Sequence, residues 1–142
     1  MAYNILVVDD SSAMRVVIKK VLHMTGLDIL VFEAGSGIDA LTVLEEQWVD
    51  MILTDIHMPQ MSGVELIEKI RSHQEFNTLP VMVISTEGRE DFLSKTQKLG
   101  VAGYLKKPFQ ATELRNAILA ILEEHNADIQ PAATNDDEDG DF

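Results

Sequence analysis

The chain has 142 residues, enough for one domain with a full hydrophobic core. Hydrophobic residues make up 46% and charged residues 25%, as in ordinary globular proteins, and no apolar run approaches the ~20 residues that span a bilayer. The absence of cysteine excludes disulfides and thiolate chemistry, and the net charge of −13 argues against a nucleic-acid partner.

The first predicted unit is a strand followed by a helix. Residues 5–8 form a short, continuous apolar run of the kind found in strands buried on both faces. Ser11 and Ser12 follow as candidate N-caps, and apolar residues then recur at helical spacing over 14–22. Gly26 is expected to end this helix.

The second unit repeats the pattern and leads into a third strand. Residues 29–34 predict a strand, 35–37 a Gly-rich turn, and 40–44 the apolar face of a second helix. Trp48 is expected to close the end of that helix over the core. Residues 51–54 predict a third, fully buried strand.

The third helix and the fourth strand follow. Ser62 and Glu65 stand three residues apart, which is the pattern of a capping box, and apolar positions continue to residue 70. Residues 79–84 predict a fourth buried strand, which ends at Ser85.

The last two helices differ in their apolar content. Residues 89–99 predict a helix with a thin apolar stripe, which we expect to be weakly packed and able to move. Residues 101–106 predict a short fifth strand. Thr112 is expected to cap a final helix whose apolar positions lie within 114–122.

Strand and helix therefore alternate five times within residues 1–125. This pattern predicts an α/β fold, a flavodoxin-like (βα)5 doubly wound parallel sheet with strand order 2-1-3-4-5. Residues 126–142 are rich in Asp and Glu and poor in large apolar residues. Because such a segment buries little apolar surface, we expect a disordered acidic tail.

Polar residues follow the ends of the predicted strands. Asp9 and Asp10 follow the first, Asp55 the third, Ser85 the fourth and Lys107 the fifth. In a 2-1-3-4-5 sheet these groups converge on the crevice at the topological switch point. Clustered carboxylates repel one another, and a hard divalent cation such as Mg²⁺ relieves the repulsion. Carboxylates, a hydroxyl and an ammonium group suit phosphoryl transfer, with Asp55 as the nucleophile.

The same residues carry a resemblance to the receiver domain of two-component response regulators, and in particular to stand-alone CheY-like receivers. The resemblance covers roughly residues 3 to 124, and we expect no output domain after it. The motifs that carry it, highly specific when taken together in this order, are Asp9-Asp10, Asp55-x-x-Met58-Pro59-x-Met61-x-Gly63-x-Glu65, Ser85, and Gly103-Tyr104-x-x-Lys107-Pro108-Phe109.

The resemblance implies roles for the acidic residues. Asp55 is expected to accept a phosphoryl group from a phosphohistidine of a sensor histidine kinase or phosphotransfer protein. Asp10, Asp55 and the backbone carbonyl of His57 are expected to hold Mg²⁺, with Asp9 acting through water. Lys107 is expected to pair with the phosphoryl oxygens, and the Lys107-Pro108 peptide bond is expected to be cis.

The resemblance also implies a switch. Ser85 is expected to donate its hydroxyl to the phosphoryl group and to move toward it, and the rotamer of Tyr104 is expected to follow. The face formed by the fourth helix, fifth strand and fifth helix would then change its affinity for a downstream protein. The chain is thus expected to be a phosphorylation-dependent signalling switch, of the chemotaxis type.

The expected protein is a phosphoacceptor and not an enzyme with an external substrate, although it would catalyse its own phosphorylation and slow dephosphorylation. The first four residues lack a basic segment, so we expect no signal peptide, no membrane partner and a cytoplasmic location.

Three residues near the acceptor stand at positions that bear on how long the phosphoryl group survives. His57, two residues after Asp55, is bulky and titratable, Thr86 stands where the family prefers Ala or Gly, and Glu87 lies two residues after Ser85. We hypothesise that His57 and Thr86 crowd the site and, with Glu87, set the lifetime of the phosphoryl group.

Two other classes of protein share parts of this pattern. A metal-dependent phosphohydrolase with an Asp nucleophile needs a second acid near the nucleophile, where this chain has His57. A flavodoxin-like FMN binder needs a phosphate loop after its first strand, where Asp9-Asp10 would repel the phosphate. Taken singly, Asp9-Asp10 also fit a helix N-terminus and Tyr104 a half-buried edge position.

Overall fold

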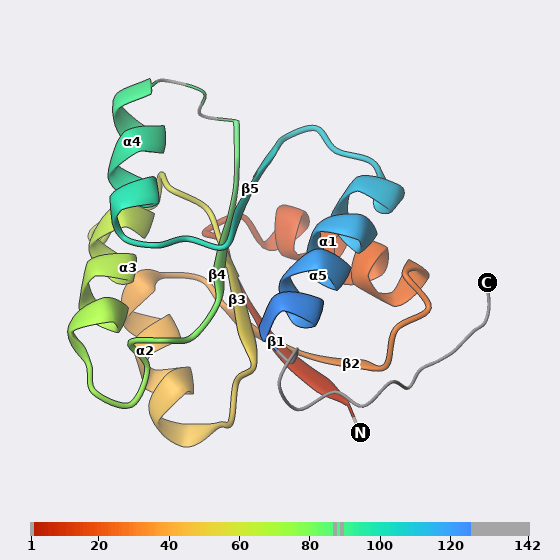
Figure 1. Cartoon of the computed structure of the whole chain (residues 1–142), viewed down its shortest axis with the longest axis horizontal. Coiled ribbons are helices and arrows are strands. Elements are labelled where there is room, and N and C mark those ends of the chain that lie inside the picture. Colours follow the sequence, from red (N-terminus) through yellow and green to blue (C-terminus); the bar gives the residue numbers. More distant parts are fainter. Residues whose placement is uncertain (1, 87, 89, 126–142) are drawn as a thin grey trace.

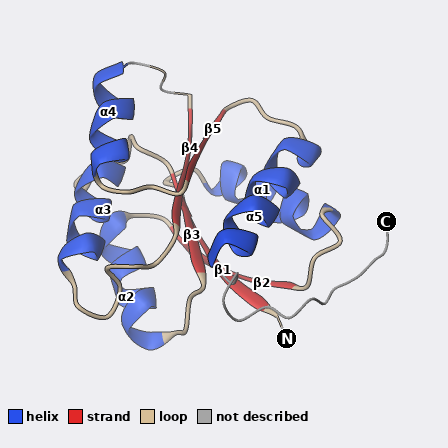
Figure 2. Ribbon diagram, in the orientation of Figure 1, coloured by secondary structure: helices blue, strands red, loops and turns tan. Residues whose placement is uncertain are grey.

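The fold is a five-stranded parallel sheet with helices on both faces (Figures 1 and 2). The computed structural model describes residues 2–86, 88 and 90–125. The strands are β1 (Tyr3–Val8), β2 (Ile29–Ala34), β3 (Met51–Thr54), β4 (Val81–Ser85) and β5 (Gly103–Lys106). The helices are α1 (Ser12–Met24), α2 (Gly37–Glu46), α3 (Gly63–Ser72), α4 (Glu90–Lys98) and α5 (Ala111–His125).

The sheet order is β2-β1-β3-β4-β5, which confirms the predicted flavodoxin-like topology. Neighbouring strands pair in parallel, with Val8 opposite Thr54 in β1 and β3 and with Ser85 opposite Lys106 in β4 and β5. The carboxyl ends of the four strands β1, β3, β4 and β5 therefore share one edge of the sheet. That edge is where the predicted site residues follow their strands.

Two apolar cores form where the helices pack on the two faces of the sheet. Figure 1 shows α2, α3 and α4 on one side of the edge-on sheet and α1 and α5 on the other. Alternate residues of β1 face opposite cores: Leu6 packs with residues of α2 and α3, and Ile5 packs with residues of α1 and α5. The central strands are buried on both faces because both layers of helices cover them, as their continuous apolar runs predict.

Helix starts follow the local sequence at three of the five helices. The Ser11 hydroxyl accepts a hydrogen bond from the Met14 N–H at 3.1 Å, and Ser62 and Glu65 form the predicted capping box. Gly26 has a positive φ of 80° directly after the end of α1, as expected for a helix stop. Ser36 caps α2 in the same way through the Asp39 N–H.

Two expectations about individual residues are wrong. Thr112 lies inside α5, because the helix begins at Ala111 and the carbonyl of Gln110 accepts the N–H groups of Glu113 and Leu114. Trp48 does not close a helix end over the core: its side chain is 77% exposed.

The remaining boundaries differ from the predicted ones by at most a few residues. The Lys107-Pro108 bond is cis, as predicted. The predicted tail, residues 126–142, lies outside the described residues. Among the described residues, no helix has the length and apolar character that crossing a membrane requires.

Candidate functional site

The site lies where β1 and β3 end side by side. The Asp55 N–H donates to the carbonyl of Val8 at 3.1 Å, so the first residue after β3 is tied to the last residue of β1. Asp9 and Asp10 follow Val8 directly. The pairing of these two strands is therefore what brings three carboxylates from distant parts of the sequence to one point.

The structure brings together the carboxylates of Asp9, Asp10 and Asp55. One oxygen from each lies within 4.8 Å of the others. Asp9 is 2% exposed, and its Oδ1 accepts the Ser11 N–H at 2.9 Å. Oδ1 of Asp55 accepts the Ile56 N–H at 2.7 Å. Asp10 is exposed and makes no hydrogen bond or ion pair with another described residue, which leaves its carboxylate open to solvent or a ligand.

Lys107 supplies the positive charge of this cluster. Its Nζ donates to Asp9 Oδ2 at 2.9 Å and to Asp55 Oδ2 at 3.1 Å. Burial alone would lower the pKa of Lys107, but the hydrogen bonds and charges of the two carboxylates outweigh it and raise the pKa above its usual 10.5. Lys107 is therefore fully charged at neutral pH.

The donor set fits a hard divalent cation. Three carboxylates and one ammonium leave two negative charges uncompensated at neutral pH, and a dication would balance them. The oxygens available are carboxylate oxygens, and no sulfur or imidazole nitrogen belongs to this cluster of described residues. Oxygen-only sites of this kind suit Mg²⁺ better than the softer transition metals.

Ser85 and Tyr104 belong to the neighbouring strand pair. Ser85 ends β4 fully buried, and its carbonyl accepts the Lys107 N–H at 2.9 Å, which links the end of β4 to the loop that carries Lys107. Tyr104 is opposite Val83 in the β4–β5 register, two positions before Ser85. The two residues thus lie on adjacent strands near the acidic cluster.

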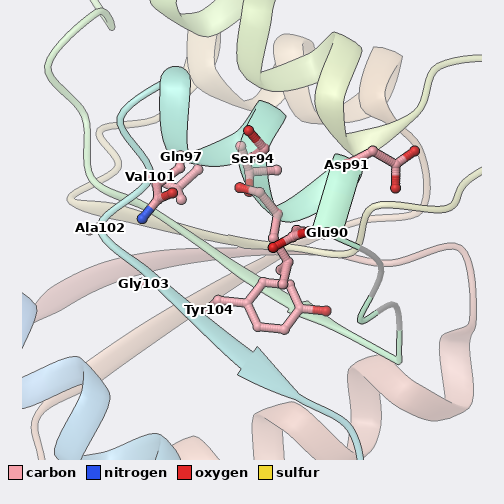
Figure 3. Close-up of a pocket in the computed structure, with 10 residues that line it drawn as sticks. Glu90, Asp91, Ser94, Gln97, Val101, Ala102, Gly103 and Tyr104 are labelled. Atoms are coloured by element: carbon pink, nitrogen blue, oxygen red, sulfur yellow. The ribbon is translucent and has the colours of Figure 1, made fainter.

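A pocket of about 930 Å³ lies between α4 and β5 beside Tyr104. Figure 3 shows the Tyr104 ring below α4, with Glu90, Ser94 and Gln97 arranged along the helix above it. Thr96 is the only residue of α4 that is buried. The apolar face of α4 is therefore thin, as predicted: Phe92 packs only partly buried against the core, and the side toward β5 borders the pocket.

Of the three residues predicted to tune phosphoryl lifetime, the structure describes His57 and Thr86, and both are exposed. His57 is exposed on the loop after Asp55, and its ring meets Phe92 of α4 edge-on, with ring centroids 5.1 Å apart. Thr86 is exposed directly after Ser85. Glu87 lies outside the described residues. His57 therefore joins the acceptor loop to α4, a contact that its sequence position did not predict.

Two further residues that sequence reasoning did not single out support the acidic cluster. Gly63 donates its N–H to the Ile56 carbonyl at 2.6 Å, and a Cβ at this position would overlap the Asp55 carbonyl oxygen. Arg15 donates from Nη1 to the Asp9 carbonyl and from Nε to Glu33 at 3.1 Å. Gly63 stands in the motif after Asp55, but nothing in the sequence near Arg15 marks its role.

Comparison with known proteins identifies the kind of domain. The family described as "Response regulator receiver domain" matches residues 5–119. Chemotaxis protein CheY-3 of Vibrio cholerae is 37% identical over 120 residues, which are 84% of this chain and 92% of that protein. Chemotaxis protein CheY of Pseudomonas aeruginosa is 37% identical over 123 residues, or 87% and 98% of the two chains.

A solved structure agrees with these relatives. The response regulator receiver domain protein from Clostridium thermocellum superposes with a TM-score of 0.80 at 28% identity. The match covers 89% of this chain and 99% of that one. The fold and the sequence motifs thus point to the same family.

Proposed function

The chain belongs to the response regulator receiver domain family, and we propose that Asp55 is its phosphoacceptor. Members of this family are phosphorylation-dependent switches of two-component systems, and this chain is one of them. The observation that supports Asp55 is its place at the end of the central strand β3, within 4.8 Å of two other carboxylates and 3.1 Å from Lys107. Family membership also favours this function over a phosphohydrolase or a flavin-binding protein.

The proposed chemistry is an in-line transfer. A carboxylate oxygen of Asp55 attacks the phosphorus of a phosphohistidine, and the new O–P bond forms as the N–P bond breaks. The imidazole leaves with the electron pair and takes up a proton from solvent. Lys107 pairs with the phosphoryl oxygens, which requires it to exchange one of its present carboxylate partners for the new group.

Asp10, Asp55 and the His57 backbone carbonyl would hold Mg²⁺ directly, with Asp9 acting through water. The open carboxylate of Asp10 supports a direct ligand there, and the burial of Asp9, which is only 2% exposed whereas Asp55 is partly exposed, supports an indirect role. When bound, the ion neutralises charge that develops on the transferred phosphoryl oxygens. Ser11 and Lys107 hold the Asp9 carboxylate in place through their N–H groups.

The proposed switch runs from Ser85 to α4. The Ser85 hydroxyl donates to the new phosphoryl group, the loop after β4 follows it, and the Tyr104 side chain turns with that loop. The pocket between α4 and β5 supports this step, because it leaves space into which α4 and Tyr104 can rearrange. The α4–β5–α5 face is then the surface that changes its affinity for a downstream protein.

The proposed partners are a sensor histidine kinase or phosphotransfer protein and a downstream protein target, with neither nucleic acid nor membrane involved. The relatives named as chemotaxis proteins support a chemotaxis-type system, and a cytoplasmic location goes with the kinase partner. Phosphorylation and slow dephosphorylation of Asp55 would be self-catalysed.

Replacing His57 and Thr86 tests the proposed control of phosphoryl lifetime. Both side chains are exposed beside the acceptor, where they can restrict the approach of water. We expect His57→Asn and Thr86→Ala each to change the first-order rate of dephosphorylation severalfold. The rate is measured as loss of phosphoprotein after removal of the donor, and unchanged rates in both variants would end the hypothesis.

The switch itself is tested by amide chemical shifts of labelled protein with acetyl phosphate and Mg²⁺. We expect shift changes in α4, β5 and the loop after Ser85, and none of them in Asp55→Asn. Ser85→Ala should still take up the phosphoryl group but lose the changes in α4 and β5. Changes confined to the residues around Asp55 would contradict a switch that reaches the α4–β5–α5 face.

A further inference from the structure

Trp48 is an exposed aromatic residue at the edge of the sheet opposite the acidic cluster. It is the only tryptophan of the chain, and 77% of it is exposed. It lies between the end of α2 and the start of β3, whereas Asp55 follows the other end of β3. Figure 1 shows α2 and α4 at opposite ends of their layer. Nothing proposed for phosphoryl transfer uses Trp48.

Hydrogen bonds hold Trp48 in one place. Its Nε1 donates to Asp50 Oδ1 at 3.0 Å, and Asp50 Oδ2 accepts the Asn4 N–H at 2.8 Å. The Trp48 carbonyl accepts from Asn4 Nδ2 at 2.7 Å. Because the indole N–H is already used, what the side chain can offer a partner is its aromatic face. Fixing that face in advance lowers the entropy cost of binding.

A groove of about 520 Å³ opens beside this side chain. Its apolar wall includes Leu44, Val49, Phe76, Leu79 and Pro80. Its charged residues are all acidic, namely Glu45, Glu46, Asp50 and Glu75, and neither Lys, Arg nor His lines it. None of the four carboxylates lies within ion-pair distance of a cationic side chain among the described residues.

Two glutamates lie at the C-terminal end of α2, where their negative charge is unfavourable for the helix. Glu45 and Glu46 are its last two residues, and its last turn contains no basic residue. Carboxylates at the negative end of a helix dipole are destabilising, where a cation would be stabilising. A bound cation at this end of α2 would therefore relieve repulsion that the free protein carries.

We propose that this groove, the Trp48 groove, docks an arginine-containing segment of a partner protein. A guanidinium group can stack on the indole face while it donates to the neighbouring carboxylates, and the apolar wall takes the adjoining part of the peptide. A second copy of this chain is the poorer occupant, because each copy carries a net charge of −13 and the groove itself is acidic. The site would tether a partner without covering the α4–β5–α5 face.

The test uses a fluorescein-labelled peptide of four Gly-Arg repeats and an otherwise identical peptide with citrulline in place of arginine. Binding is followed by anisotropy at about 0.15 M salt, where screening weakens distant charges. We expect wild type to bind the arginine peptide and not the citrulline peptide. Intrinsic fluorescence of Trp48 should change with the same midpoint, and an unchanged spectrum at saturation would overturn the proposal.

Variants separate the groove from the general negative charge of the protein. Glu46→Gln with Glu75→Gln should weaken binding about fivefold, and Trp48→Leu about threefold. The matched control, Asp39→Asn with Glu68→Gln, removes two exposed charges elsewhere and should weaken binding less than about twofold. Equal losses in both double variants, or unchanged affinity in Trp48→Leu, would overturn the proposal. So would self-association of the unphosphorylated protein through this face in sedimentation experiments.

Discussion

Gly63 allows the backbone to pack closely around the phosphoacceptor because it has no Cβ. A Cβ at this position would overlap the Asp55 carbonyl oxygen and lie 2.8 Å from the Ile56 Cα. Both neighbours are backbone atoms, so neither can turn aside as a side chain could. The start of α3 can therefore approach the loop after β3 this closely only with glycine, and the position of Asp55 depends on that approach.

We expect Gly63→Ala to lower the free energy of unfolding by about 1–3 kcal/mol, the usual range for overpacking, and to reduce phosphoryl uptake. The matched control is Gly35→Ala, whose Cβ would meet Arg15 Nη1 at 3.4 Å, an ordinary contact with a flexible side chain. Urea unfolding and phosphorylation of both variants provide the measurement. Equal effects of the two substitutions would show that close approach at Gly63 is unimportant.

Lys107 makes a stability contribution that depends on pH in a defined direction. Its pKa is raised in the folded protein, because hydrogen bonds and charges from Asp9 and Asp55 outweigh the opposing effect of burial. A raised pKa means that the contribution is full below the unfolded value of about 10.5 and is lost as the pH rises through the folded value. It is thus complete at neutral pH.

Lys107→Met should lower the free energy of unfolding by about 3 kcal/mol at pH 7, because it leaves buried Asp9 without its cation. The difference from wild type should stay constant from about pH 7 to 10 and shrink above about 10.5. Lys106→Met, at the exposed neighbouring position, should change stability by less than about 0.5 kcal/mol. A difference that grows with pH above 10.5 would contradict the assignment.

Among the elements, the end of α4 is held by a side chain of the neighbouring helix α3. Arg71 of α3 donates from Nε to the Leu99 carbonyl at 2.8 Å and from Nη2 to the Gly100 carbonyl at 3.2 Å. Its Nη1 donates to the Leu79 carbonyl at 2.8 Å, before β4. Burial lowers the pKa of Arg71, yet the group remains charged at neutral pH. One guanidinium therefore joins the exits of both α3 and α4 to the chain just before β4.

Arg71→Met should cost about 2–3 kcal/mol of stability, since it leaves partly buried carbonyls without donors. It should also speed hydrogen exchange at Val101 and Ala102, whose N–H groups bond across this junction. Arg115→Met removes a single bond, to the Thr25 carbonyl on the other side of the sheet, and serves as control. Faster exchange at Val101 in the control as well would mean that the effect is global.

For the whole molecule, the topology could be predicted because strand and helix patterns alternate five times and the central strands β3 and β4 are short apolar runs that both layers of helices bury. The serines that cap α1 and α3 could be predicted because capping is local chemistry. The position of Trp48 could not, because Asn4, which donates to its carbonyl, lies 44 residues away in the sequence and only the fold brings the two together. The overlap avoided at Gly63 likewise depends on how α3 meets β3, which no local pattern encodes.

The candidate site shows the same division. The strand ends and sheet order predict that Asp9, Asp10 and Asp55 converge, and the structure places their oxygens within 4.8 Å. Lys107 pairs with Asp9 and Asp55 because it follows β5, whose carboxyl end lies at the same edge of the sheet. The contact of His57 with Phe92 could not be predicted, because it joins a loop to a helix 35 residues further along the chain, and no sequence pattern sets that distance.

The most direct test of the account is the mass of the protein after incubation with acetyl phosphate, with Mg²⁺ or with a chelator. Wild type is predicted to gain one phosphoryl group only when Mg²⁺ is present, and Asp55→Asn to gain none. A wild-type protein that stays unmodified with the metal, or an Asp55→Asn variant that is modified to the same extent, would contradict the assignment of Asp55 as the phosphoacceptor.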